Sequence, residues 1–188
     1  MRIRDPKGFS LVEMLVSIFI FTVIFSLVLA YVRGEEKSRA LELSAQDLAS
    51  FIRKAQFLSL TGKEKEIDGV FRFPRGGYGV RLSVCAAPPC TYYLFGDLDG
   101  QLDYDQADGE QIGAEKITLP SFVEVSGLKV NGVEVAEADV VFRPPRPTVC
   151  VDRDCSGDGN LSLKLFHTST GREAFIFINS ETGQVSVD

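Results

Sequence analysis

Five aspartates crowd into twelve residues in the second half of the chain: Asp97, Asp99, Asp103, Asp105 and Asp108. Like charges at this density repel one another unless water solvates them or a cation bridges them. Carboxylate oxygens are the ligands of Ca²⁺, which takes about six to eight of them. Gly100 and Gly109 let the backbone turn, but the glycine falls fourth in the loop and an EF-hand has it sixth. The segment is therefore a candidate calcium site, with a solvated surface turn as the alternative.

A second acidic loop runs from Asp152 to Asn160 and has its glycine, Gly157, at the sixth position. Its closing acid is missing, because Leu163 stands at the twelfth position. This loop is the weaker of the two calcium candidates.

The cysteines form two close pairs, Cys85 with Cys90 and Cys150 with Cys155. Four cysteines allow three disulfide connectivities. If this part of the chain lies outside the cytoplasm, two local disulfides are expected. A zinc site built from all four is the sharper alternative, although the four residues between the cysteines of each pair are more than a zinc knuckle usually has. The third alternative is that the four cysteines are free and buried.

The element that must anchor these loops is a long helix, predicted from Phe9 to about Leu60. Its first part, Phe9–Val32, has 24 residues and one charge, Glu13. At about 1.5 Å per residue it is long enough to cross the ~30 Å apolar core of a bilayer. Beyond it, apolar residues recur at alternating steps of four and three. This spacing predicts a stripe that packs on a folded head, with the opposite face in water: Leu41, Ala45, Leu48, Ile52 and Ala55.

Residues 63–188 have the short apolar runs and frequent turns of a mostly β head. Asn131-Gly132 between two such runs predicts a hairpin. The expected fold class is α+β, with the long N-terminal helix packed against an antiparallel β-sheet head. The domains are a leader at 1–8, the helix at 9–62 with a membrane or filament-core part at 9–32, and the head at 63–188. Strands are expected at 78–84, 91–95, 122–125, 139–142, 161–166, 174–178 and 184–187.

Charge argues against nucleic acid as a partner. From Lys63 to the end there are 12 basic and 20 acidic side chains, a net charge of −8. An acidic surface repels phosphates. Enzymatic activity is not expected either, because no nucleophile elbow, phosphate loop or metal-binding helix motif occurs. The lone His167 falls at a strand end, where a structural role is expected.

Glu13 is the residue that decides the class. A charge inside an apolar segment costs on the order of 3 kcal/mol and usually has a function. A secretory signal, cut after Val28-Leu29-Ala30, and a plain membrane anchor are the two alternatives, and neither explains this carboxylate.

The segment Lys7-Gly8-Phe9-Ser10-Leu11-Val12-Glu13 resembles the start of a type IV prepilin. In that family a basic leader ends in glycine, the mature chain begins with Phe, and a glutamate stands fifth. The resemblance implies that a prepilin peptidase cuts between Gly8 and Phe9 and methylates Phe9. It places the chain in the inner membrane as a single-pass protein with its head outside the cytoplasm, and then in a filament.

The same resemblance implies how the subunits assemble. The Glu13 carboxylate of one subunit pairs with the α-ammonium of a neighbour's Phe9, so that two charges neutralise each other in an apolar setting. The partners implied are other pilins or pseudopilins, which bind through the N-terminal helix, and an inner-membrane assembly platform.

Two later segments are similar to minor pilins and pseudopilins of the FimT and GspH kind: Tyr93–Gly100 and Phe175–Val185. The expected function is a structural subunit of a type IV pilus or a type II secretion pseudopilus, with no cofactor required. The alternative is a DNA-uptake pilin that binds DNA through its head.

Overall fold

A computed structural model describes residues 10–67, 69–144 and 148–188. The chain divides into two compact units, residues 1–39 and residues 40–188. We call the second unit the head. The described residues contain one helix and these strands: α1 (Leu11–Thr61), β1 (Lys65–Ile67), β2 (Val70–Arg72), β3 (Gly77–Ser83), β4 (Thr91–Asp97), β5 (Gln111–Thr118), β6 (Val123–Val130), β7 (Val133–Glu134), β8 (Glu137–Arg143), β9 (Thr148–Val151), β10 (Asn160–His167), β11 (Glu173–Asn179) and β12 (Val185–Val187).

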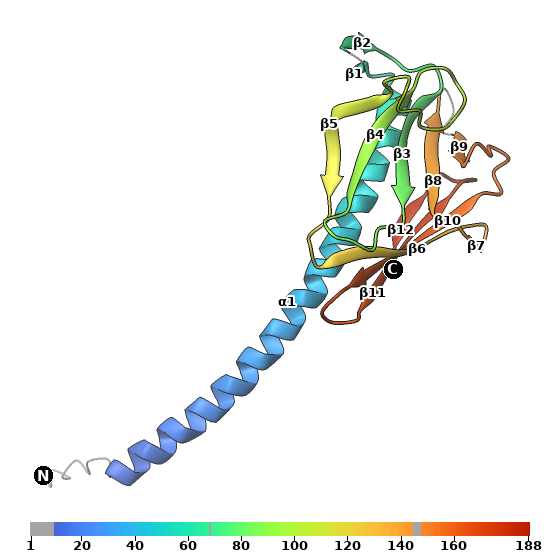
Figure 1. The fold of residues 1–188 in the computed structure, drawn as a ribbon. Coiled ribbons are helices and arrows are strands. Elements are labelled where there is room, and N and C mark those ends of the chain that lie inside the picture. The colour runs from blue at the N-terminus through green and yellow to red at the C-terminus, as the bar shows by residue number, and fades with distance from the viewer. Residues whose placement is uncertain (1–9, 68, 145–147) are drawn as a thin grey trace, which may run out of the picture. The chain divides into compact units, whose positions relative to one another are not determined.

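Helix α1 begins at Leu11 and ends at Thr61 (Figure 1). It stops where Gly62 adopts a positive φ of 60°, a conformation that glycine reaches without strain. The Lys63 N–H then donates back to the Leu58 carbonyl, which closes the last turn. Its segment Leu11–Leu29 is long and apolar enough to cross a membrane.

The second half of α1 buries the stripe that its spacing predicts. Every member of the stripe is at most 3% exposed, and Ala49 and Leu58 extend it. The helix makes hydrogen bonds to strands of two different sheets: the Ser59 hydroxyl accepts from the Tyr78 N–H of β3, and Arg53 donates to the Val185 carbonyl of β12.

Two five-stranded antiparallel sheets and one hairpin make up the rest of the head (Figure 1). The first sheet has the order β5-β4-β3-β8-β9, and the second has the order β12-β11-β10-β6-β7. An isolated bridge between Cys85 and Val125 links the two sheets. Strands β1 and β2 form the separate hairpin.

The main core is a cluster that the helix shares with both sheets, and a smaller second cluster contains Phe95, Val141 and Cys150 of the first sheet. In β10 the alternation is strict: Leu161, Leu163 and Leu165 are buried, and the residues between them are only half-buried. The predicted Asn131-Gly132 hairpin is confirmed, because Val130 pairs with Val133 across it. The α+β fold class is confirmed as well.

Four strands were not predicted: β1, β2, β5 and β9. Strands β1 and β2 have three residues each, which is too short for a periodic signal. Strand β5 is an edge strand that carries Gly113, Glu115 and Lys116, and strand β9 follows a proline-rich segment. Both positions tolerate sequences with weak strand character.

We predict that Ile52→Ala lowers the free energy of unfolding of the head by about 2–5 kcal/mol, because it leaves a cavity in the shared core. Denaturant unfolding of residues 40–188 measures this. Phe57→Ala, on the exposed face of the same helix, is the matched control and should change stability by less than about 0.5 kcal/mol. Equal losses for the two variants would contradict the packing described here.

Candidate functional site

The apolar segment of α1 presents a single ionisable side chain. Between Ser10 and Leu29 only Glu13 can carry a charge, and it lies in the first turn of the helix. A negative charge there interacts favourably with the helix dipole. The predicted processing residues, Gly8 and Phe9, lie outside the described residues.

The hydroxyl groups of this segment are satisfied within the helix. Ser17 donates to the Glu13 carbonyl at 2.7 Å, Thr22 to the Ile18 carbonyl at 2.8 Å, and Ser26 to the Thr22 carbonyl at 2.8 Å. Each bond reaches back four residues, as hydroxyls do when no other partner is present. The segment therefore suits an apolar surrounding, and Glu13 is the polar group that needs a partner from outside it.

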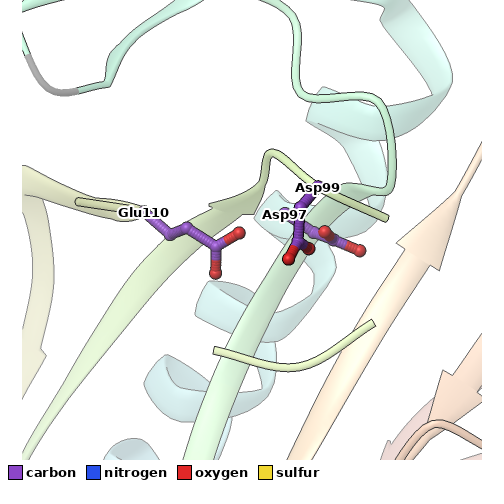
Figure 2. A group of neighbouring side chains, drawn as sticks. All are labelled: Asp97, Asp99 and Glu110. Carbon is purple, nitrogen blue, oxygen red and sulfur yellow. The ribbon is translucent and has the colours of Figure 1, made fainter. Parts of the chain in front are cut away.

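A second candidate site lies in the head, where three carboxylates converge (Figure 2). Asp97 ends β4, Asp99 follows it, and Glu110 precedes β5. One oxygen from each lies within 4.8 Å of the others. Asp97 and Glu110 are both 0% exposed, whereas Asp99 faces solvent.

The two buried carboxylates hold the loop between them. Asp97 accepts from the N–H groups of Gly100 at 2.7 Å and Leu102 at 2.9 Å. Glu110 accepts from the N–H groups of Leu98 at 2.8 Å and Asp105 at 2.9 Å. Every one of these oxygens accepts one hydrogen bond and keeps a second lone pair, so a cation can be bound without breaking the loop.

Gly76 explains how the Asp97 carboxylate fits in the interior. A Cβ at residue 76 would lie 1.8 Å from an Asp97 carboxylate oxygen. The Gly76 N–H also donates to the Asp97 carbonyl at 3.0 Å. Only glycine allows the backbone to approach this closely.

Burial raises the pKa of the Asp97 and Glu110 carboxyls above their ordinary values, although the N–H donors oppose this shift. The pKa of Asp99 is lowered, chiefly because the Gln101 N–H donates to its carboxylate. The cluster thus combines two carboxyls that resist ionisation with one that ionises readily.

Of the five predicted calcium ligands, the structure brings together only Asp97 and Asp99. Asp103 pairs with Arg153, and Asp105 accepts from the Ala107 N–H at 2.7 Å. Asp108 is exposed. Glu110, which sequence reasoning missed as a ligand, takes their place in the cluster. Residues of the second acidic loop do not form such a cluster in the described part of the chain.

The loop between Asp97 and Glu110 covers the outer face of the first sheet. The Tyr104 ring packs against Phe95 with ring centroids 5.5 Å apart, and the Arg81 guanidinium lies 5.0 Å from the centre of the Tyr104 ring. Arg81 also makes two hydrogen bonds to Asp139, which is 4% exposed and accepts from the Tyr104 N–H at 3.1 Å. Contacts of the loop with the sheet therefore hold it in place without an ion.

The disulfides are the two local ones, Cys85–Cys90 and Cys150–Cys155. Cys85–Cys90 closes the connection between β3 and β4, and Cys150–Cys155 closes the turn after β9. His167 is 2% exposed, stacks on Phe122 at a centroid distance of 5.0 Å, and accepts from the Ser169 N–H through Nδ1. These contacts fit a structural histidine.

We predict that Glu110→Gln changes how the free energy of unfolding of the head depends on pH. Because the folded pKa of Glu110 is raised, its contribution to stability is full below the unfolded pKa and is lost as pH rises through the folded pKa. Glutamine cannot ionise, so the stability deficit of the variant against the parent protein should shrink as pH rises from about 4, the ordinary pKa of a glutamate, toward neutral. Urea unfolding of the head across this range measures it.

Asp108→Asn is the control, because this exposed carboxylate lies outside the cluster. A deficit of Glu110→Gln that grows with pH would contradict a raised pKa.

Calcium binding stays a prediction, with Asp97, Asp99 and Glu110 as its donors. Millimolar Ca²⁺ should raise the Tm of the head, because the ion compensates two buried carboxylates. Asp99→Asn should abolish the rise, whereas Asp103→Asn, outside the cluster, should leave it. An unchanged Tm of the parent head at several millimolar Ca²⁺ would show that the cluster does not bind calcium at this concentration.

Comparison with known protein families matches residues 3–29 to the prokaryotic N-terminal methylation motif. The match includes Gly8, Phe9 and Glu13 and does not extend into the head. No curated protein and no solved structure matches the chain. The motif implies cleavage by a prepilin peptidase and assembly with other pilins. With this motif, the apolar segment Leu11–Leu29 and Glu13 within that segment, the chain is a type IV prepilin-like protein.

Proposed function

We propose that the chain is a structural subunit, a minor pilin or pseudopilin, of a type IV pilus or a type II secretion pseudopilus assembled from the inner membrane. The observation that carries this is the methylation motif together with Glu13, the only charged residue of the exposed apolar segment Leu11–Leu29. The similarity of Tyr93–Gly100 and Phe175–Val185 to FimT and GspH proteins supports the minor class.

In this function the peptidase cuts between Gly8 and Phe9 and methylates the new N-terminus. The segment Leu11–Leu29 holds the subunit in the membrane, in a single pass with the head outside the cytoplasm. Two disulfides support that location, because disulfides persist in oxidising compartments. During assembly the segment moves from lipid to contacts with other subunits.

Glu13 acts as the register element. Its carboxylate gains a partner only when a neighbour brings its α-ammonium alongside, and a buried charge without a partner is strongly unfavourable. Packing of the apolar side chains stabilises many axial offsets between neighbouring helices, whereas the charge pair favours a single offset.

A non-enzymatic role is part of this proposal, and so is the absence of a required cofactor. DNA uptake is the second function that the sequence suggested. The net charge of −8 over residues 63–188 weighs against it, because it disfavours approach to phosphates.

We predict that Glu13→Gln reduces incorporation into filaments on the order of tenfold, because the neutral side chain cannot pair with the ammonium. Glu13→Asp, which keeps the charge, should retain part of the incorporation. Quantifying the subunit in sheared filaments against the membrane fraction measures this.

Mass spectrometry of the membrane fraction serves as the control. The parent protein and both variants should begin at N-methyl-Phe9. A mature start near Tyr31 would contradict the proposed processing. Normal incorporation of Glu13→Gln would show that the charge pair is dispensable.

A further inference from the structure

Strands β3 and β4 separate from each other as they approach the turn that connects them. Their pairing in the first sheet ends at Val80 and Leu94. Strand β3 nevertheless stays paired with β8 as far as Ser83, and β4 is already paired with β5 at Thr91. The last part of β3 and the first part of β4 therefore each have a sheet neighbour on one side only, and a gap opens between them.

Contacts at the two ends of the connecting turn explain why the strands diverge. The Cys85 N–H donates to the Val125 carbonyl at 2.9 Å, and the Val125 N–H donates back to the Cys85 carbonyl at 3.1 Å. This pair draws the end of β3 toward β6 of the second sheet. The Cys90 carbonyl accepts from the Leu119 N–H at 2.8 Å, which keeps the start of β4 beside the end of β5. Backbone contacts therefore set the gap.

A cavity of about 180 Å³ lies at this gap. Tyr92 belongs to its lining, is 2% exposed and donates from its hydroxyl to the Ser83 carbonyl at 2.9 Å. The other lining residues come from β3, from β4 and from the loop that follows β4: Arg81, Ser83, Thr91, Tyr93, Phe95 and Tyr104. The cavity thus combines aromatic rings with hydroxyl groups and one guanidinium.

The volume of the cavity limits what it can hold to a single ring. A cavity of about 150 Å³ in another protein holds one benzene molecule. A cavity of about 180 Å³ therefore has room for one six-membered ring with small substituents. Further units of a longer ligand would extend into solvent.

Charges of both signs surround the cavity, which favours a neutral ligand. Two of the five N–H groups of Arg81 donate to the Asp139 carboxylate, so the guanidinium charge is balanced. Hydrogen bonding to Asp139 raises the pKa of Arg81, and the charges of Glu137 and Asp103 add to this effect. Lys116 of the neighbouring strand β5 is exposed and supplies a positive charge. A ligand of either charge would meet like charges as well as opposite ones.

The polar groups of the lining select a ring that carries hydroxyls. The Ser83 hydroxyl and three N–H groups of Arg81 have no hydrogen-bond partner in the described part of the chain. An apolar ring would cover these groups and leave them unsatisfied, which is unfavourable. A sugar hydroxyl both donates and accepts, so it can pair with each of them. Tyr93, which is 37% exposed, offers an aromatic face to the C–H groups of such a ring.

We propose that this cavity binds one neutral pyranose ring of a saccharide. Tyr93 packs on a face of the ring, and Arg81 and Ser83 hydrogen-bond to its hydroxyls. Tyr104 belongs to the loop that the two buried carboxylates hold, so the shape of the site depends on that loop. The inference goes beyond the proposed function, because it gives the head a ligand in addition to a place in a filament.

Saturation-transfer NMR on the full-length protein tests this, in a detergent whose headgroup is not a sugar. The probes are methyl glucoside, methyl galactoside and methyl N-acetylglucosaminide, each in its pyranose form. A further probe, p-cresol, represents an aromatic side chain. The expected result is saturation of at least one glycoside, strongest at its ring C–H protons, with the millimolar affinity of a single small ring.

Two substitutions in the lining should weaken this binding. Tyr93→Ala should weaken it at least about tenfold, because it removes the aromatic face. Phe71→Ala is the matched control, since Phe71 is 69% exposed on strand β2 and does not line the cavity. Ser83→Ala removes one hydroxyl, so it should weaken glycoside binding about fivefold and leave p-cresol unaffected.

Glycoside binding that survives Tyr93→Ala unchanged would place the ligand elsewhere and overturn the inference. Binding of p-cresol without any glycoside would overturn the saccharide and indicate an aromatic side chain of a protein partner. No signal from any probe at tens of millimolar would overturn the site. The measurement uses isolated subunits, so none of these results affects the proposed function.

Discussion

The packing of one helix stripe on two sheets is the interaction on which the head depends. Each sheet has five strands, and apolar residues from one face of each join a single cluster with the second half of α1. Removing the helix would expose both faces at once. The same helix carries the segment that is long and apolar enough to cross a membrane, so one element belongs both to the core of the head and to the candidate membrane span.

Local periodicity made much of this fold predictable. The stripe from Leu41 to Ala55 and the alternation in β10 each lie within one element, and both are buried as expected. Strand β5 was missed because its pattern is broken by Gly113 and by charged residues that suit an edge. Spacing alone could not show the partners of Arg53 and Lys54 of α1, because Val185 and Glu115 lie far along the chain.

The acidic loop shows most clearly which contacts the sequence alone could not predict. Asp97 and Asp99 were identified from crowding in sequence, whereas Glu110 joins them through the pairing of β4 with β5. Phe95 lies opposite Gln111, and the Gly96 N–H donates to the Glu110 carbonyl. Such nonlocal pairing leaves no signal in the spacing of the carboxylates. The pairing of Asp103 with Arg153 is nonlocal too, and it removes a ligand that spacing had suggested.

The hydroxyls of Ser17, Thr22 and Ser26 donate to carbonyls of their own helix, and this affects how a subunit transfers from lipid to a filament. A helix whose polar side groups are already closed on its own backbone breaks no hydrogen bond on leaving lipid and needs none on arrival. Extraction into a filament then exchanges acyl-chain contacts for side-chain contacts of similar polarity. Of the polar side chains in Leu11–Leu29, only the Glu13 carboxylate would change its partner on this transfer, because the three hydroxyls keep theirs.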